Sequence, residues 1–165
     1  MFLGWKSKLA ALLMVPVAFF LVSCGFFHTT SAPAGIGREV VDGKFAFIVT
    51  HVDTSPTFGD TRAQGLYVVV SMAVRNVGTQ AQVFEMAAQK LKDSAGRVYS
   101  ASLMDPPFLV KAGNNIDPSL QVSVRLAFDV MRDLRPTQIV LHGSASSPGA
   151  PVNLMQPPSP SPSRG

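Results

Sequence analysis

The fold is decided by the stretch Leu120-Gln121-Val122-Ser123-Val124-Arg125-Leu126-Ala127-Phe128-Asp129-Val130. Apolar residues alternate here with mostly polar ones, which is the two-residue period of a strand that has one face in a core and the other in water. A helix would instead place its apolar residues three and four positions apart. The stretch therefore predicts a β-strand in a chain built from strands.

Six further segments have strand patterns. Residues 66–77 are apolar until Arg75, as in a central strand, and residues 44–53 alternate large apolar with other residues. No segment has convincing helical spacing. About seven short strands separated by turn residues predict an all-β antiparallel sandwich. The other strands are expected at residues 82–85, 89–93, 98–100 and 138–142, and the turns at Asp42-Gly43, Asn76-Val77-Gly78, Asp93-Ser94-Ala95-Gly96 and Asp105-Pro106-Pro107. The expected core consists of Phe45, Phe47, Val68, Val70, Phe84, Leu91, Val124, Leu126 and Phe128.

Length and charge allow one such domain and argue against a nucleic-acid partner. The chain has 165 residues with 14 basic and 10 acidic side chains. Setting aside Lys6 and Lys8 near the start leaves 12 basic residues, and these are scattered singly along the sequence. Phosphate binding needs several basic side chains on one face, so we expect no nucleic-acid binding.

The first 23 residues have the three parts of an export signal. Lys6 and Lys8 precede an apolar stretch at residues 9–22, and Ser23 is a small residue before the expected cleavage point. A 14-residue helix rises about 21 Å, which is too short for the roughly 30 Å hydrocarbon core of a bilayer. We therefore expect a cleaved signal peptide rather than a membrane span.

The segment Leu21-Val22-Ser23-Cys24 resembles the lipobox of bacterial lipoproteins. The resemblance implies that the thiol of Cys24 takes a diacylglycerol and that a signal peptidase cuts before it. Cys24 is the only cysteine, which excludes an intrachain disulfide. We expect a lipid anchor on the outer face of the cell membrane. Two alternatives stay open: a signal anchor extending through Phe27, and an ordinary leader cysteine with cleavage elsewhere.

Four parts of the chain follow from these patterns. Residues 1–23 are the signal peptide, and residues 24–37 are a lipidated, flexible tether rich in glycine, serine, threonine and proline. Residues 38–143 form the sandwich. Residues 144–165 are expected to be a disordered tail, because their repeated prolines cannot donate the hydrogen bonds of a sheet.

The residue pattern contains no catalytic motif and no cofactor motif. None of the three histidines has a nucleophile or carboxylate at motif spacing, so we expect no enzyme, no cofactor and no metal site. An exported small-ligand or metal (copper) carrier is the alternative function, because methionine and histidine are ligands for Cu(I). The residues that supply copper ligand types are Met72, Met86, Met104, Met131, His51 and His142, and those that supply calcium ligand types are Asp53, Asp60, Asp105 and Asp117.

Two long connections are the candidate binding loops, since long loops on rigid sandwiches often carry function. The first is residues 53–64, which contain Phe58 and Asp60. The second is residues 105–115, which contain Phe108 and Leu109. Each aromatic residue either anchors a partner or caps the core.

Three segments carry a likeness to known proteins: Val74-Arg75-Asn76-Val77-Gly78, Lys90-Leu91-Lys92-Asp93-Ser94-Ala95-Gly96-Arg97-Val98-Tyr99 and Val124-Arg125-Leu126-Ala127-Phe128-Asp129-Val130. Taken together, they resemble a bacterial family: the immunoglobulin-like domain of unknown function found in many Gram-positive and actinobacterial lipoproteins. This family is related in fold to a small secreted mycobacterial antigen. The likeness spans residues 40–142 and implies an immunoglobulin-like sandwich that binds a protein or a cell-wall or other envelope component. The chain departs from the family at two turns, with Ser119 where glycine is frequent and Met131 where proline is frequent.

Overall fold

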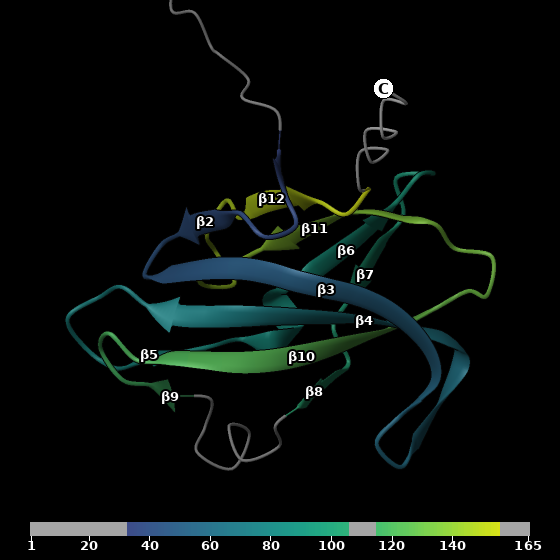
Figure 1. Ribbon diagram of the computed structural model, residues 1–165, viewed down its shortest axis with the longest axis horizontal. Helices are drawn as coiled ribbons and strands as arrows, with labels where there is room; N and C mark the ends of the chain where they lie inside the picture. The colour runs from purple at the N-terminus through teal and green to yellow at the C-terminus, as the bar shows by residue number, and fades with distance from the viewer. Residues whose placement is uncertain (1–32, 106–114, 156–165) are drawn as a thin grey trace, which may run out of the picture. The chain divides into compact units, whose positions relative to one another are not determined.

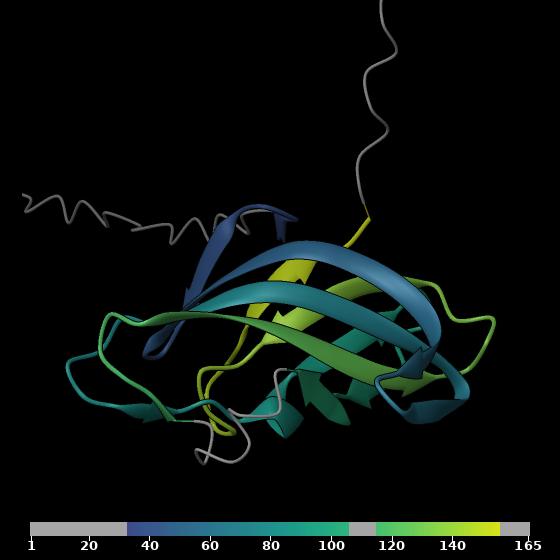
Figure 2. The same cartoon turned by 60° about the horizontal axis from the view of Figure 1, so that its bottom comes forward.

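The structure is a computed structural model that describes residues 33–105 and 115–155. Strands make up most of these residues, and the short 3-10 turn η1 (Met86–Ala88) is the helical element among them. Two five-stranded sheets lie against each other, as Figures 1 and 2 show. Within the described part of the chain, no helix has the length and apolar character needed to span a membrane.

Each sheet has a distinct strand order. The sheet that contains the longest strands is called the long sheet, and the other is called the short sheet. A separate pair of strands, β5 (Gln82–Val83) and β9 (Asn115–Ile116), lies beside them. In order across the sheet, the long sheet contains β2 (Glu39–Asp42), β3 (Phe45–Phe58), β4 (Thr61–Asn76), β10 (Gln121–Val130) and β8 (Leu103–Asp105). The short sheet contains β1 (Ala34–Gly35), β12 (Ala150–Asn153), β11 (Pro136–Leu141), β6 (Lys90–Asp93) and β7 (Val98–Ser100).

The decisive stretch forms β10, which lies between β4 and β8 in the long sheet. It pairs antiparallel with β4 without a break, from Gln121 opposite Arg75 to Val130 opposite Leu66. Leu126 and Phe128 are fully buried on the face that meets the short sheet. The alternating pattern thus predicts both the strand and the face that it buries.

The core lies between the two sheets and is rich in phenylalanine. The rings of Phe45 and Phe84 pack edge to face with their centroids 6.0 Å apart. All nine expected core residues belong to this cluster, so the predicted core and the predicted all-β sandwich are confirmed. The strand count is higher than the seven expected, because several strands have only two to four residues.

The boundaries expected for the tether and the tail were wrong. β1 lies in the expected tether, and β12 lies in the expected disordered tail. The two strands pair with each other in parallel, and Val152 is fully buried. Pro151 is tolerated because the pairing with β1 begins only at the next residue. Residues 156–165 of the expected tail lie outside the described residues.

Ser119 occupies the turn before β10 in a backbone conformation that suits glycine. Its φ is +63°, in the left-handed region where a side chain costs about 1–2 kcal/mol. We therefore expect Ser119→Gly to raise the free energy of unfolding by about 0.5–1 kcal/mol, after the extra chain entropy of glycine is subtracted. Urea unfolding measures this difference. Ser119→Ala is the matched control and should bring no gain, since alanine keeps the Cβ atom; equal gains from both variants would contradict the explanation.

Candidate binding site

The first candidate loop is a β-hairpin and not a loop, which corrects the expectation for residues 53–64. β3 continues to Phe58 and β4 begins at Thr61, with Phe58 opposite Thr61. Gly59 makes the tight turn with a φ of +56°. The hairpin bends at a β-bulge between Ser55 and Thr57, and its curved tip is visible in Figure 2.

Phe58 caps a small apolar cluster on the outer face of the long sheet. Its side chain is 8 % exposed, and its ring lies 6.3 Å from that of Tyr67 in an edge-to-face arrangement. Val69 and Ala127 complete the buried part of this cluster. The sequence left two roles open for Phe58, as an anchor for a partner or as a cap. The structure shows Phe58 as the cap of this cluster.

A hollow of about 410 Å³, here called the hairpin pocket, opens beside this cluster. The guanidinium carbon of Arg125 lies 5.1 Å from the centre of the Phe58 ring. The Nε atom of Arg125 lies 3.8 Å from a carboxylate oxygen of Asp105, and both side chains are about half exposed. An arginine that rests on an aromatic ring and is open to solvent can bind a carboxylate or stack on a flat group of a partner. The lining residues are Phe58, Gly59, Thr61, Leu103, Met104, Asp105 and Arg125.

The hairpin pocket brings the first candidate loop next to Asp105, the first residue of the second candidate loop. Asp105 ends β8, which pairs with β10 so that Asp105 lies directly opposite Arg125. The segment with Phe108 and Leu109 begins just after Asp105, but these two residues lie outside the described residues. Asp60 is exposed at the hairpin turn, next to the pocket residue Gly59. No sequence signal pointed to Arg125 as a pocket residue, because the pairing of β8 with β10 is not visible in the sequence.

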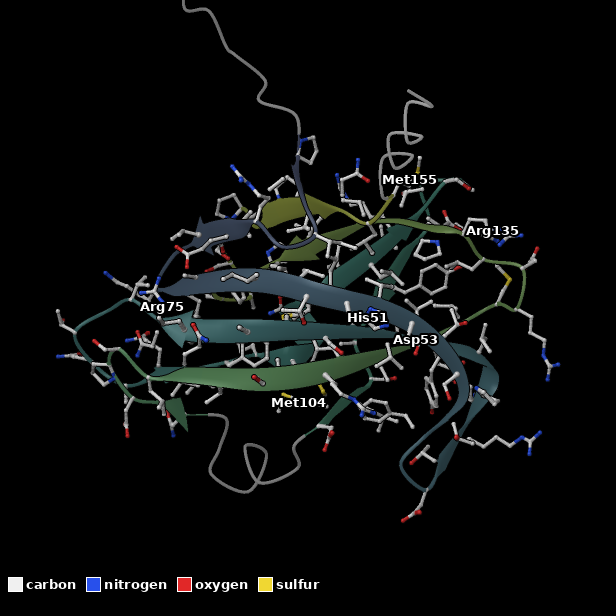
Figure 3. The ribbon with its side chains drawn as sticks, viewed as in Figure 1. His51, Asp53, Arg75, Met104, Arg135 and Met155 are labelled. Atoms are coloured by element: carbon white, nitrogen blue, oxygen red, sulfur yellow. The ribbon has the colours of Figure 1, made fainter. Side chains whose placement is uncertain are left out.

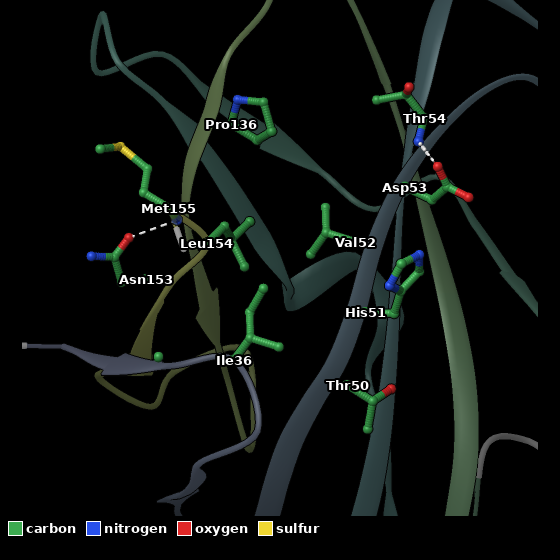
Figure 4. A pocket seen from close by; sticks show the side chains of 11 residues that line it. Ile36, Thr50, His51, Val52, Asp53, Thr54, Pro136, Asn153, Leu154 and Met155 are labelled. Atoms are coloured by element: carbon green, nitrogen blue, oxygen red, sulfur yellow. Dashed lines mark hydrogen bonds between the residues drawn. The ribbon is translucent and has the colours of Figure 1, made fainter. Parts of the chain in front are cut away.

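A second hollow, the β3 groove, has a volume of about 700 Å³ and runs between β3 and the end of β12. Figure 4 shows Ile36, Val52 and Leu154 turned toward one another in it, with His51 and Asp53 turned to the other side of β3. Met155 is 61 % exposed at its border. The groove therefore has an apolar floor and a rim formed by a strand.

Asp42 links the two sheets, a role that its position in a predicted turn did not suggest. Its carboxylate accepts hydrogen bonds from the backbone N–H groups of Gly143 (2.6 Å) and Gly149 (3.1 Å). Burial alone would raise the pKa of Asp42. These two donors, the Ser147 hydroxyl and the nearby His142 outweigh burial and lower the pKa below its usual 3.8. The side chain is thus held as a carboxylate.

Four of the residues considered for copper have structural contacts. Met72 and Met104 belong to the core, and Met86 packs against it. His142 contacts the backbone oxygen of Ser147 at 3.0 Å through Nδ1. In residues 33–105 and 115–155, no three side chains of histidine, cysteine, aspartate or glutamate come together as a metal site. Cys24 and the lipobox residues Leu21, Val22 and Ser23 lie outside the described part of the chain.

A family model described as a domain of unknown function, DUF4352, matches residues 34–151. The chain belongs to the DUF4352 family. The matched range includes β1 and the start of β12, in agreement with the corrected boundaries of the fold. Comparison with curated proteins finds no match.

Solved structures from Mycobacterium tuberculosis and Bacillus subtilis are similar in fold to this DUF4352 domain. MPT63, a secreted protein from Mycobacterium tuberculosis, is 12 % identical with a TM-score of 0.53, and the match covers 77 % of this chain and 100 % of that one. The yjhA protein from Bacillus subtilis is 14 % identical with a TM-score of 0.54, covering 74 % and 99 %. At this identity the likeness shows the fold alone. It confirms the predicted relation to a secreted mycobacterial protein.

Proposed function

We propose that this DUF4352 protein is a lipoprotein of the cell envelope, anchored to the outer face of the cell membrane through Cys24. Its sandwich is a non-catalytic module that binds a protein or another envelope component. The anchor is supported by the lipobox-like segment that ends at Cys24, with an apolar stretch of export-signal length before it. The binding role is supported by one observation above all: Arg125 is held over Phe58 in a pocket that Asp105 also lines.

The pocket chemistry favours a partner that presents a carboxylate beside a flat or apolar group. Arg125 is already placed by Phe58 and by Asp105, so little side-chain freedom is lost when a partner binds. Leu103 and Met104 add apolar surface next to the charged pair. An acidic protein segment and a cell-wall peptide both offer such groups, and the arginine is the residue expected to contribute most.

The lipid anchor is tested by partitioning between detergent and aqueous phases. We expect the wild-type chain in the detergent phase and Cys24→Ala in the aqueous phase, because the chain has no other thiol to acylate. A Cys24→Ala chain that stayed in the detergent phase would instead establish the signal anchor extending through Phe27.

The binding role is tested by crosslinking in intact cells, followed by mass spectrometry of the captured material. Arg125→Ala should reduce capture of the partner about tenfold, as expected for an arginine at the centre of an interface. Arg132→Ala is the matched control, since Arg132 is also exposed but does not line the hairpin pocket. Equal capture by both variants would show that the partner binds elsewhere or that the protein binds none.

A further inference from the structure

β3 has a free edge beside the β3 groove. On one side β3 pairs with β4 along most of its length, whereas on the other side β2 pairs with it only between Phe45 and Ile48. One further backbone hydrogen bond follows on this side of β3: the N–H of Gly37, which precedes β2 in the chain, donates to the carbonyl of Val49 at 2.8 Å. Among the described strands, none pairs with this side of β3 at residues 50–54, which are called the free edge below.

The backbone groups of Val52 are available to another strand. On β4, the N–H of Asn76 donates to Leu120 on the side away from β3, and alternate residues of β4, including Val70 and Val68, direct their groups to that same side. Val52 and Thr54 lie opposite Val70 and Val68, so their backbone groups point away from β4. The N–H of Thr54 already donates to the carboxylate of its neighbour Asp53 at 2.9 Å. Unpaired groups of this kind are a template for pairing with a further chain.

The sequence of the free edge, Thr50-His51-Val52-Asp53-Thr54, is complementary to itself. When two copies pair antiparallel about Val52, each His51 lies opposite the Asp53 of the other copy, and each Thr50 lies opposite a Thr54. An imidazole N–H donates to a carboxylate in either protonation state, so both cross-strand pairs are favourable. His51 and Asp53 are exposed on β3 (Figure 3), and neither forms an ion pair within the described residues.

We propose that the free edge of β3 binds the free edge of a second copy of this chain, in a two-fold dimer that joins the two long sheets. Such an interface is isologous, because each copy contributes the same five residues. The partner strand also covers the β3 groove, where Val52 faces Ile36 and Leu154 and where Met155 is exposed. One register irregularity of β3 lies between Val49 and His51 and includes Thr50 at the start of the free edge, and the other lies between Ser55 and Thr57. Together they limit the pairing to this window.

Variants that exchange the charges of His51 and Asp53 test the proposal. The oligomeric state of the full-length chain in mild detergent is measured by sedimentation over a range of protein concentrations. We expect a concentration-dependent dimer for the wild type. His51→Asp places two carboxylates opposite each other twice per dimer and should raise the dissociation constant roughly tenfold. Asp53→Lys alone should also weaken the dimer. The double variant His51→Asp/Asp53→Lys restores opposite charges across the edge and should restore dimerisation.

Asp60→Lys is the matched control, since it makes the same change at an exposed position outside the free edge. Thermal unfolding of each variant verifies that the fold is kept. A wild-type chain that stays monomeric at all concentrations would overturn the proposal. So would a double variant that is as weak as the single ones, or a dimer that none of the edge variants changes.

Discussion

Asp42→Ala is expected to lower the free energy of unfolding by about 3 kcal/mol, because it removes a buried carboxylate and leaves two half-buried N–H groups without their acceptor. Asp42 is 6 % exposed at the end of β2 in the long sheet. Its partners Gly143 and Gly149 lie in the connection between β11 and β12 of the short sheet. The carboxylate therefore connects the two sheets at this end of the sandwich.

The neighbouring residues leave the connection no simple way to adapt. A Cβ atom on Gly143 would lie 2.2 Å from the backbone oxygen of Asp42, so the two backbones are in direct contact. Gln89 fixes the same connection from the other side: its amide oxygen accepts from the N–H of His142, and its amide nitrogen donates to the oxygen of His142. With both sides fixed, the orphaned N–H groups cannot move easily to new partners.

Urea unfolding at a series of pH values measures the loss of stability in Asp42→Ala and shows whether it comes from the ionised carboxylate. The folded-state pKa of Asp42 lies below its usual 3.8, so the carboxylate stabilises the fold above that pH and the contribution is lost as the pH falls through the folded-state pKa. The stabilities of the wild type and of Asp42→Ala should therefore converge in acid. Glu39→Ala is the control in the same strand. It removes an exposed ion pair with Arg75 and should cost less than 1 kcal/mol. Equal losses from the two variants would contradict the proposed role of Asp42.

The sequence predicted the parts of this fold that depend on local pattern. The alternation at residues 120–130 identified β10 and its buried face, and the aspartate and glycine at residues 42–43 identified the turn before β3. The role of Asp42 could not be predicted, since its acceptor atoms bind N–H groups more than 100 residues away. β12 was missed for a similar reason: the proline pattern indicated disorder, and only the pairing with β11 and β1 shows why Val152 is buried.

The candidate site was predicted in part. The sequence identified Phe58 from an aromatic residue between polar neighbours, but it placed Phe58 in a loop. The hairpin exists because β3 and β4 continue to pair through serine and threonine residues that are compatible with strands. Arg125 was assigned to a solvated face, and it is indeed half exposed. Its place over Phe58 depends on the curvature of the hairpin, which a two-residue period does not encode.

Gly65 lies where this hairpin leaves the sheet, and Gly65→Ala is expected to lower the free energy of unfolding by about 3 kcal/mol. A Cβ atom there would lie 2.1 Å from the backbone oxygen of Val130 and 3.3 Å from the Cα atom of Met131. Backbone atoms cannot rotate away as a side chain can, so β4 and the end of β10 must separate. The carboxylate of Asp129 holds the same junction by accepting from the N–H groups of Gln64 (2.9 Å) and Gly65 (3.2 Å).

Gly59→Ala is the control that distinguishes the close contact between Gly65 and Val130 from the general effect of glycine on backbone freedom. Gly59 has a positive φ, but a Cβ atom would meet nothing within 4 Å, so alanine there should cost only about 1 kcal/mol. Thermal and urea unfolding of the two variants measure the difference. Because the junction at Gly65 orients the hairpin that carries Phe58, Gly65→Ala should also weaken capture of a partner at the hairpin pocket. Equal destabilisation by the two alanines would show that the contact with Val130 is not what requires glycine at residue 65.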